Sequence, residues 1–264
     1  GHRLPPLVDR DSRLGISGRL GPRGEEIEEL DASELEALAA RITATGAEAV
    51  AICLLHAYAN DAHERAVAEA IGATGLPLSV SSELVPEFRE YERTSTTVVN
   101  AYVSPIMSRY LGRLSREAGA ARVTIMGSNG GALPVERARR EPVHTILSGP
   151  AGGVVGALTW ARRSGIEQVI SFDMGGTSTD VSLCPGRPLR TREFEIAGQP
   201  TAIPVIDIHT VGAGGGSLAR VDAGGALRVG PQSAGAQPGP ICYDRGGTGV
   251  TVTDAHVWLG RLPV

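Results

Sequence analysis

The chain has 264 residues, a net charge of −4 and 42% hydrophobic residues, values that are ordinary for a globular protein with one or two domains. The negative charge gives no electrostatic reason to expect nucleic acid or an anionic membrane as a partner. The longest apolar runs, such as 49–55, have the length of a strand and not of a membrane span. The first residues lack the apolar segment of a signal peptide. The three cysteines are widely spaced, so we expect a reduced cytoplasmic protein.

All 25 basic residues are arginine, and the sequence contains no lysine. A P-loop lysine and a lysine general base are therefore excluded. Any phosphate chemistry must use backbone amides, hydroxyl groups, a metal or arginine. The three cysteines form no CxxC pair and lack a neighbouring His/Asn context, which argues against a cysteine nucleophile.

Helix and strand patterns alternate over the first part of the chain. After a Pro/Gly/Arg-rich stretch over 1–30, expected to be extended, a helix is predicted between the N-cap Asp31 and the C-cap Gly46. A strand, a helix and a strand are then predicted over 49–55, 61–71 and 78–80. This alternation predicts a three-layer α/β fold with a largely parallel sheet.

The charged stretch 84–93 is predicted to be a connector, and residues 95–118 a long amphipathic helix with a kink at Pro105. We place a domain boundary here, so that residues 1–92 form one domain and residues 93–264 a second. After residue 180 the chain is rich in β patterns and glycine, and a helical pattern returns only near the C-terminus.

The segment Asp173–Asp180 has the composition of a phosphate-binding turn between two strands. Gly175 and Gly176 lack Cβ atoms, so their N–H groups can approach an anion and adopt φ > 0. Hydroxyl donors follow at Thr177, Ser178 and Thr179. The flanking carboxylates Asp173 and Asp180 can hold the divalent cation that accompanies a polyphosphate. An ordinary glycine-rich β-turn is the alternative interpretation.

Two other glycine-rich segments are candidate binding elements. Residues 148–156 place glycines at a helix start, which suits either an anion or close packing of the helix on a sheet. Asp207 and His209 lie on one face of a predicted strand, where they face a metal or substrate or pair with each other. The loop that follows has amides that can approach phosphate, at Gly212, Gly214, Gly215 and Gly216.

A third candidate lies at the end of the first predicted buried strand. His56 follows this strand, where α/β proteins place ligands, so it can point into a cleft. His63 and Glu64 come on the next helix and are expected at the surface. No HExxH or comparable spacing predicts a zinc site.

The order of these segments resembles the hydantoinase A/5-oxoprolinase family. The resemblance covers nearly the whole chain and is carried by the segments LLHAYAN, VPEFREYERTSTTVVNAY, GSNGG, LSGPAGGVVGA, SFDMGGTSTDVSL, DIHTVGAGGGSLA and VTDAHVWLGRL. It implies the fold of the actin, heat-shock chaperone and sugar kinase superfamily, in which two lobes bind ATP between them. The end of a first lobe and the start of a second are then expected here, because no first-lobe hairpin and no adenosine loop are recognisable.

By the same resemblance, Asp173–Asp180 is the second-lobe phosphate motif, with Asp173 or Asp180 near Mg²⁺. The implied reaction is ATP-dependent phosphorylation of a cyclic amide or imide carbonyl, followed by ring opening with water. The implied partner is a hydantoinase B-type subunit. Two alternatives stay open, an ATP-binding subunit of a ketone carboxylase and a non-catalytic scaffold that binds a partner subunit. A sugar or acetate-type kinase is disfavoured by the long segments that such kinases lack.

Overall fold

The computed structural model describes residues 6–119 and 121–263, which fold into two compact units. The first unit contains the described residues up to Ser148 together with Thr191–Val205. The second contains Gly149–Arg190 and the described residues from Ile206 onward. The chain therefore leaves the first unit, returns to it for a short stretch and leaves it again. Strands β9 (Arg190–Thr191) and β12 (Val205–Ile206) pair at these two crossings.

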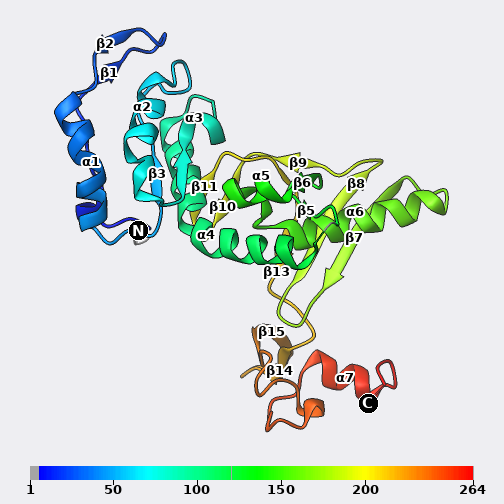
Figure 1. The fold of residues 1–264 in the computed structure, drawn as a ribbon. Coiled ribbons are helices and arrows are strands. Elements are labelled where there is room, and N and C mark those ends of the chain that lie inside the picture. Colours follow the sequence, from blue (N-terminus) through cyan, green and yellow to red (C-terminus); the bar gives the residue numbers. More distant parts are fainter. Residues whose placement is uncertain (1–5, 120, 264) are drawn as a thin grey trace. The chain divides into compact units, whose positions relative to one another are not determined.

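Helices and short strands alternate in the first unit (Figure 1). Its helices are α1 (Ala32–Ala44), α2 (Ala62–Ile71), α3 (Ser81–Leu84), α4 (Glu90–Glu117) and α5 (Val135–Arg140). Its strands are β1 (Arg19–Leu20), β2 (Glu26–Glu28), β3 (Val50–Ile52), β4 (Leu78–Val80), β5 (Thr124–Met126), β6 (Ala132–Pro134), β10 (Phe194–Ile196) and β11 (Gln199–Thr201). The stretch 1–30 contains β1 and β2, and its first five residues lie outside the described part.

The first core of this unit forms around the parallel pair β3–β4. Helix α1 begins where the sequence predicts, because the Asp31 side chain accepts the N–H of Glu34. Its apolar face and that of α2 then cover the two strands. The buried side chains of this core are Leu38, Ile42, Ile52, Val67, Ile71 and Val80.

Helix α4 begins at Glu90, so the connector predicted over 84–93 is limited to residues 85–89, between α3 and α4. The first turns of α4 bury polar side chains, among them Arg93 and Thr97, and an apolar periodicity cannot reveal such a buried face. The helix continues past Pro105 to its end. It also runs through the predicted domain boundary at residues 92 and 93, whereas the compact units divide at Ser148. The assignment of 1–92 and 93–264 to two lobes stays a prediction.

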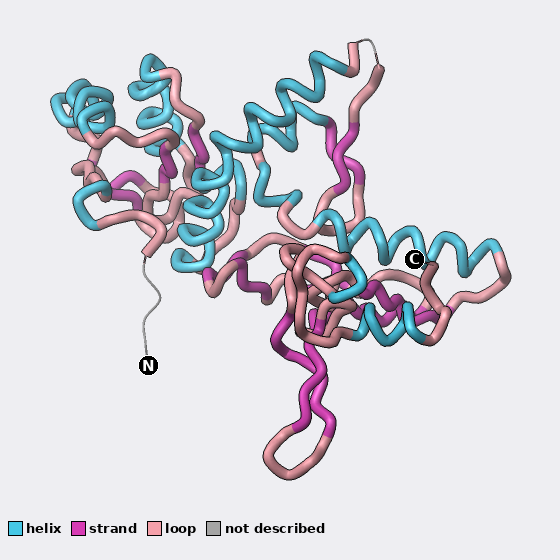
Figure 2. The backbone as a smooth tube through the Cα atoms, turned by 90° about the horizontal axis from the view of Figure 1, so that it is seen from below, coloured by secondary structure: helices cyan, strands magenta, loops and turns pink. Residues whose placement is uncertain are grey.

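The C-terminal half of α4 packs against the β5–β6 hairpin and α5 (Figure 2). Leu111 of α4 is buried together with Val135 and Ala138 of α5. Side chains from the hairpin, including Ile125 and Leu133, complete this core. No helix in the described part of the chain, α4 included, is long and apolar enough to cross a membrane.

The second unit is built on a three-stranded antiparallel sheet in the order β13–β8–β7. Its elements are α6 (Ser148–Arg163), β7 (Gln168–Met174), β8 (Thr179–Pro185), β13 (His209–Val211), β14 (Ser217–Val221), β15 (Leu227–Ser233) and α7 (Val252–Trp258). Helix α6 runs along one face of the sheet (Figure 1), where Val154 and Leu158 pack against Cys184 and Ile206. Strands β14 and β15 form a separate hairpin.

The expectation of a largely parallel sheet is wrong for this structure. Among the strand pairs whose register is described, β3–β4 is parallel and the others are antiparallel. The reason is the length of the connections, because a short turn such as that between β7 and β8 can only join antiparallel strands. The β3–α2–β4 segment has the crossover helix that parallel pairing needs.

Candidate phosphate and metal site

Asp173 and Asp180 lie directly opposite each other on the paired strands β7 and β8. Side chains at such positions share one face of the sheet, with Cβ atoms about 4.5–5.5 Å apart, and like charges there destabilise the pair. In the described part of the chain, neither carboxylate forms an ion pair with arginine or histidine. Mg²⁺ is commonly held by one or two carboxylates plus phosphate oxygens and water. Two opposed carboxylates fit that cation.

The turn between the two strands leaves backbone donors free. Gly175 donates its N–H to the carbonyl of Ser178 at 2.9 Å. Within the described structure, the N–H groups of residues 176–178 donate to no protein acceptor. A Cβ placed on Gly176 meets no other atom within 4 Å, so the space beside this residue is open. Successive free N–H groups in a turn are a typical anion-binding arrangement.

The glycine loop 212–216 packs against this turn and holds it. The N–H groups of Gly215 and Gly216 donate to the carbonyls of Gly175 and Gly176, at 2.9 and 2.7 Å. A Cβ on Gly214 would lie 2.7 Å from backbone atoms of Gly176 and of the next residue, so a side chain there must displace the turn. The loop thus engages the carbonyls of the turn and leaves its N–H groups free.

These contacts change the role that the sequence suggested for the loop. The N–H of Gly214 donates to Ser217, and those of Gly215 and Gly216 donate to the turn, so three of the expected phosphate donors are engaged within the protein. Direct contact of Gly212, Gly214, Gly215 and Gly216 with a nucleotide stays a prediction. Support of the turn is the role that the geometry gives to Gly214, Gly215 and Gly216.

Two details of the turn differ from expectation. Gly175 and Gly176 can adopt a positive φ but do not do so here, and close approach of the 212–216 loop constrains the turn instead. Thr179 is 3% exposed and donates its hydroxyl to the carbonyl of Ala213 at 2.5 Å. Thr177 is exposed and Ser178 is half-buried, so these two hydroxyls are better placed for phosphate.

Two further residues lie near the carboxylates: Thr210, which sequence reasoning missed, and Gly153, which belongs to the candidate segment 148–156. Thr210 lies opposite Asp180 on β13 and donates its hydroxyl to Oδ1 of that carboxylate at 2.6 Å. Gly153 of α6 lies beside Asp173, and a Cβ there would be 3.4 Å from Oδ2 of Asp173. Neither contact is visible in the sequence, since each depends on strand register or on how the helix lies on the sheet.

Asp207 and His209 do not join this cluster. His209 pairs with Val181, the neighbour of Asp180. The side chains of His209 and Asp180 therefore lie on opposite faces of the sheet. Asp207 lies between β12 and β13, is exposed, and forms no described ion pair with His209. No group of three or more His, Cys, Asp and Glu side chains among the described residues is arranged to hold a metal. A separate metal or substrate role for Asp207 and His209 stays a prediction.

A second polar cluster lies in the first unit at the C-terminal ends of β3 and β4. The expectation that His63 and Glu64 lie at the surface is wrong, because they are 5% and 0% exposed. Glu64 accepts from the N–H of Leu54, the N–H of Ser82 and the hydroxyl of Ser81. Glu64 faces the strand ends from α2, whereas the His63 ring is hydrogen-bonded to Glu26 of β2 at 2.7 Å.

Arg93 completes this cluster from α4. Its guanidinium is 1% exposed and donates to Ser81, to the carbonyl of Leu54 and to Glu90. His56 adopts a left-handed conformation with φ of 59° and donates its N–H to Glu90. The cluster fixes the loop after β3 to the start of α4, and that is a structural role.

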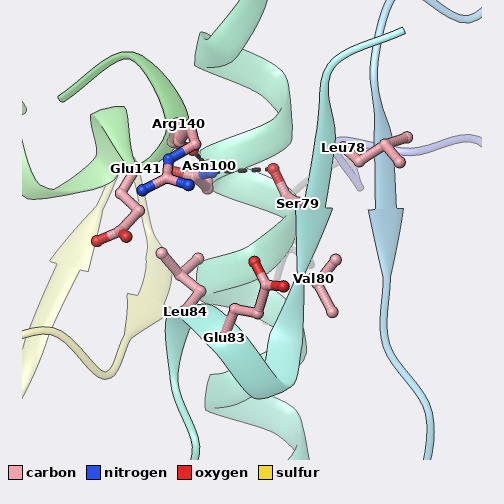
Figure 3. A pocket seen from close by; sticks show the side chains of 8 residues that line it. All are labelled: Leu78, Ser79, Val80, Glu83, Leu84, Asn100, Arg140 and Glu141. Carbon is pink, nitrogen blue, oxygen red and sulfur yellow. Dashed lines mark hydrogen bonds between the residues drawn. The ribbon is translucent and has the colours of Figure 1, made fainter. Parts of the chain in front are cut away.

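The pocket in Figure 3 has a volume of about 120 Å³ and lies beside β4 and α4 of the first unit. It is lined by Leu78, Ser79, Val80, Glu83, Leu84, Asn100, Arg140 and Glu141. Asn100 donates to Ser79 and to the carbonyl of Arg140, and it accepts the N–H of Val143. These bonds occupy its amide within the protein, so the polar wall of the pocket serves packing.

Comparison with known proteins places the whole chain among relatives. The family model described as hydantoinase/oxoprolinase matches residues 93–264, and that of the hydantoinase/oxoprolinase N-terminal region matches residues 3–75. Caprolactamase subunit alpha of Pseudomonas jessenii is 42% identical over 99% of this chain and 40% of its own length. 5-Oxoprolinase 1 of Arabidopsis thaliana is 39% identical over 96% of this chain and 20% of its own length.

Solved structures agree with these relatives. The crystal structure of the ATP-dependent caprolactamase from Pseudomonas jessenii has a TM-score of 0.82 at 39% identity, covering 100% of this chain and 40% of that one. A nucleotide-free structure of acetone carboxylase has a TM-score of 0.74 at 30% identity, covering 99% of this chain and 38% of that one. The chain therefore spans well under half the length of each of these relatives.

Proposed function

Because the chain belongs to the hydantoinase/oxoprolinase family, we propose that its Asp173–Asp180 turn binds the Mg²⁺ complex of ATP. The observation that carries this proposal is the set of free N–H groups at 176–178 beside two opposed carboxylates. In this proposal the N–H groups bind phosphate oxygens, and Asp173 and Asp180 hold Mg²⁺ from one face of the sheet. The solved relatives described as ATP-dependent support the choice of nucleotide.

For the whole protein we propose ATP-dependent ring opening of a cyclic amide. Caprolactam and 5-oxoproline, which give two of the relatives their names, are both cyclic amides. The γ-phosphoryl group of ATP is transferred to the amide carbonyl oxygen and ADP is released. Water then attacks the activated carbon, the ring C–N bond breaks and phosphate leaves. Phosphoryl transfer needs mainly positioning and charge neutralisation. Here the turn orients the phosphates, and Mg²⁺, when bound, neutralises their charge.

A second candidate is an ATP-binding subunit of a ketone carboxylase, which the similarity to acetone carboxylase favours. In this candidate too, we propose that the turn binds Mg·ATP and that a phosphoryl group is transferred to an oxygen derived from the carbonyl. Caprolactamase subunit alpha is by its name one part of an assembly. We propose by analogy that this protein works with a hydantoinase B-type subunit. A scaffold that binds such a partner without nucleotide is the contrasting possibility.

Calorimetric titration of the chain with Mg·ATP tests the proposal. We expect binding by the wild type, and a loss of about tenfold or more in affinity for Asp173→Asn and for Asp180→Asn, since each removes a charged contact. Glu167→Gln is the matched control, because it removes one exposed carboxylate just before β7 and leaves the turn intact. A folded wild-type chain that gives no heat contradicts the proposal and favours the scaffold.

The substrate class is tested by phosphate release from ATP in the presence of a lactam or of an aromatic ketone, using the chain together with its partner subunit. Stimulation by the lactam supports the amide hydrolase. Phosphate release that is stimulated by the ketone with bicarbonate, and not by the lactam, supports the carboxylase. Both outcomes keep the turn as the nucleotide site.

A further inference from the structure

We propose that Thr210 is a positioning residue for the Asp180 carboxylate, an inference that rests on the proposed function of the turn. Thr210 lies directly opposite Asp180 in the pairing of β13 with β8. Its hydroxyl donates to Oδ1 of Asp180 at 2.6 Å. A hydrogen bond to a carboxylate at this distance is of the short, charge-assisted kind.

The three side chains form one row across the sheet. Asp173 on β7 is opposite Asp180 on β8, and Asp180 is opposite Thr210 on β13. Residues directly opposite each other share a face, so all three point to the same side. Asp180 therefore has a carboxylate on one side and a hydroxyl donor on the other.

This order suits a cation site. Repulsion from Asp173 favours rotation of the Asp180 side chain away from the position between the strands. The bond from Thr210 holds Oδ1 and opposes that rotation. Within the described structure no protein donor reaches Oδ2 of Asp180, so this oxygen is available to a cation.

Because Thr210 is exposed, its effect on the position of the Asp180 carboxylate can be measured separately from any effect on the stability of the fold. Its side chain is exposed, so removal of the hydroxyl leaves no buried polar atom unpaired and costs little stability. Valine keeps the β-branched shape that suits a strand. Thr210→Val therefore keeps the fold and removes one hydrogen bond from one carboxylate.

The test measures the Mg²⁺ concentration that half-saturates ATP binding, by titration at fixed ATP. For Thr210→Val we expect this concentration to rise about tenfold, as for the loss of one hydrogen bond to a charged group, and for Thr210→Ser to change by less than about twofold. ATP binding with Mg²⁺ removed by chelation should be the same in all variants. Thermal unfolding is recorded for each variant alongside.

Ser182→Ala is the matched control. Ser182 is 2% exposed and donates its hydroxyl to the carbonyl of Asp207 at 2.8 Å, so its loss weakens the same sheet without touching a carboxylate. We expect lower thermal stability and an unchanged Mg²⁺ requirement. An unchanged Mg²⁺ requirement in Thr210→Val overturns the inference, and so does a Thr210→Ser variant as impaired as Thr210→Val. Absence of Mg²⁺-dependent ATP binding in the wild type overturns the proposed function itself, and this inference with it.

Discussion

At the scale of single residues, the sequence predicts which residue types of the turn bind phosphate and metal, but not how these residues are arranged. Two carboxylates around a glycine pair predict a phosphate and metal site at Asp173 and Asp180. That these two residues face each other follows from the register of β7 and β8, which composition does not specify. Thr210 becomes visible only when β13 is paired with β8, because it is far away in sequence.

Gly214 shows how backbone approach fixes a residue type. Its φ is not in the left-handed region, so conformational freedom is not the reason for glycine. The reason is the neighbouring backbone, which leaves no room for a methyl group. The sequence offered four glycines in this loop and no means of ranking them.

We predict that Gly214→Ala destabilises the protein by about 1–3 kcal/mol, as for overpacking of a well-packed site, and weakens Mg·ATP binding because the turn must shift. Gly212→Ala is the control, since its Cβ would come no closer than 3.9 Å to another residue. Urea unfolding and calorimetry measure both effects. Equal losses in the two variants would show that the close contact with the turn is not the cause.

At the scale of elements, α1 is predicted from the sequence because its N-cap and its apolar period agree, and α2 is predicted from its helical pattern alone. The start of α4 escapes prediction because its buried face is polar. Buried Arg93 donates to the carbonyl of Leu54, far away in the sequence, and buried Thr97 donates to the carbonyl of Arg93, one turn earlier. A hydrophobic pattern does not reveal polar residues that are buried in this way. The same reason explains the burial of Glu64.

The first turn of helix α7 contains a capping box and also contacts the glycine loop 212–216. Thr251 and Asp254 form a capping box, and Asp254 also accepts the N–H of Cys242 at 2.7 Å. In the same turn of helix, Thr253 donates its N–H and its hydroxyl to the carbonyl of Gly215, each at 2.8 Å. The first turn of α7 therefore supports the loop that supports the phosphate turn.

We predict a pH-dependent role for Asp254. Burial raises the pKa of this carboxyl, but hydrogen bonds from Cys242 and Thr251 outweigh burial and lower its pKa from 3.8 to about 2. A depressed folded-state pKa stabilises the protein above the unfolded value, and that stabilisation is lost as pH falls through the folded value. Asp254→Ala should therefore lower the free energy of unfolding by about 1–2 kcal/mol at pH 7, the size of a capping effect.

Between about pH 4 and pH 2 this difference between wild type and Asp254→Ala should shrink, because the wild-type carboxylate becomes protonated. Asp61→Ala is the control at pH 7, since Asp61 is an N-cap residue whose side chain makes no capping hydrogen bond. Urea unfolding as a function of pH gives both results. A deficit that stays constant from pH 7 to pH 2 would rule out the charged cap.

At the scale of the whole molecule, the chain has an α/β fold of the actin-like ATPase superfamily, as its family and its structural relatives indicate. The ordered motifs identify this family from the sequence, and the comparisons confirm it. The division into compact units was not predicted from the sequence, because residues 191–205 return to the first unit after the chain has entered the second. Such a return depends on long-range packing, here by Ile203 and Val205 against Val99 of α4.

The central claim is that the turn between β7 and β8 holds the metal and the phosphates. It is tested most directly by amide NMR of the chain with Mn²⁺ and a non-hydrolysable ATP analogue in place of Mg·ATP. The account predicts paramagnetic broadening that is strongest for residues 173–180 and for Thr210, and that disappears when Mg²⁺ displaces Mn²⁺. Broadening centred elsewhere, or none at the turn while the analogue is bound, would contradict it.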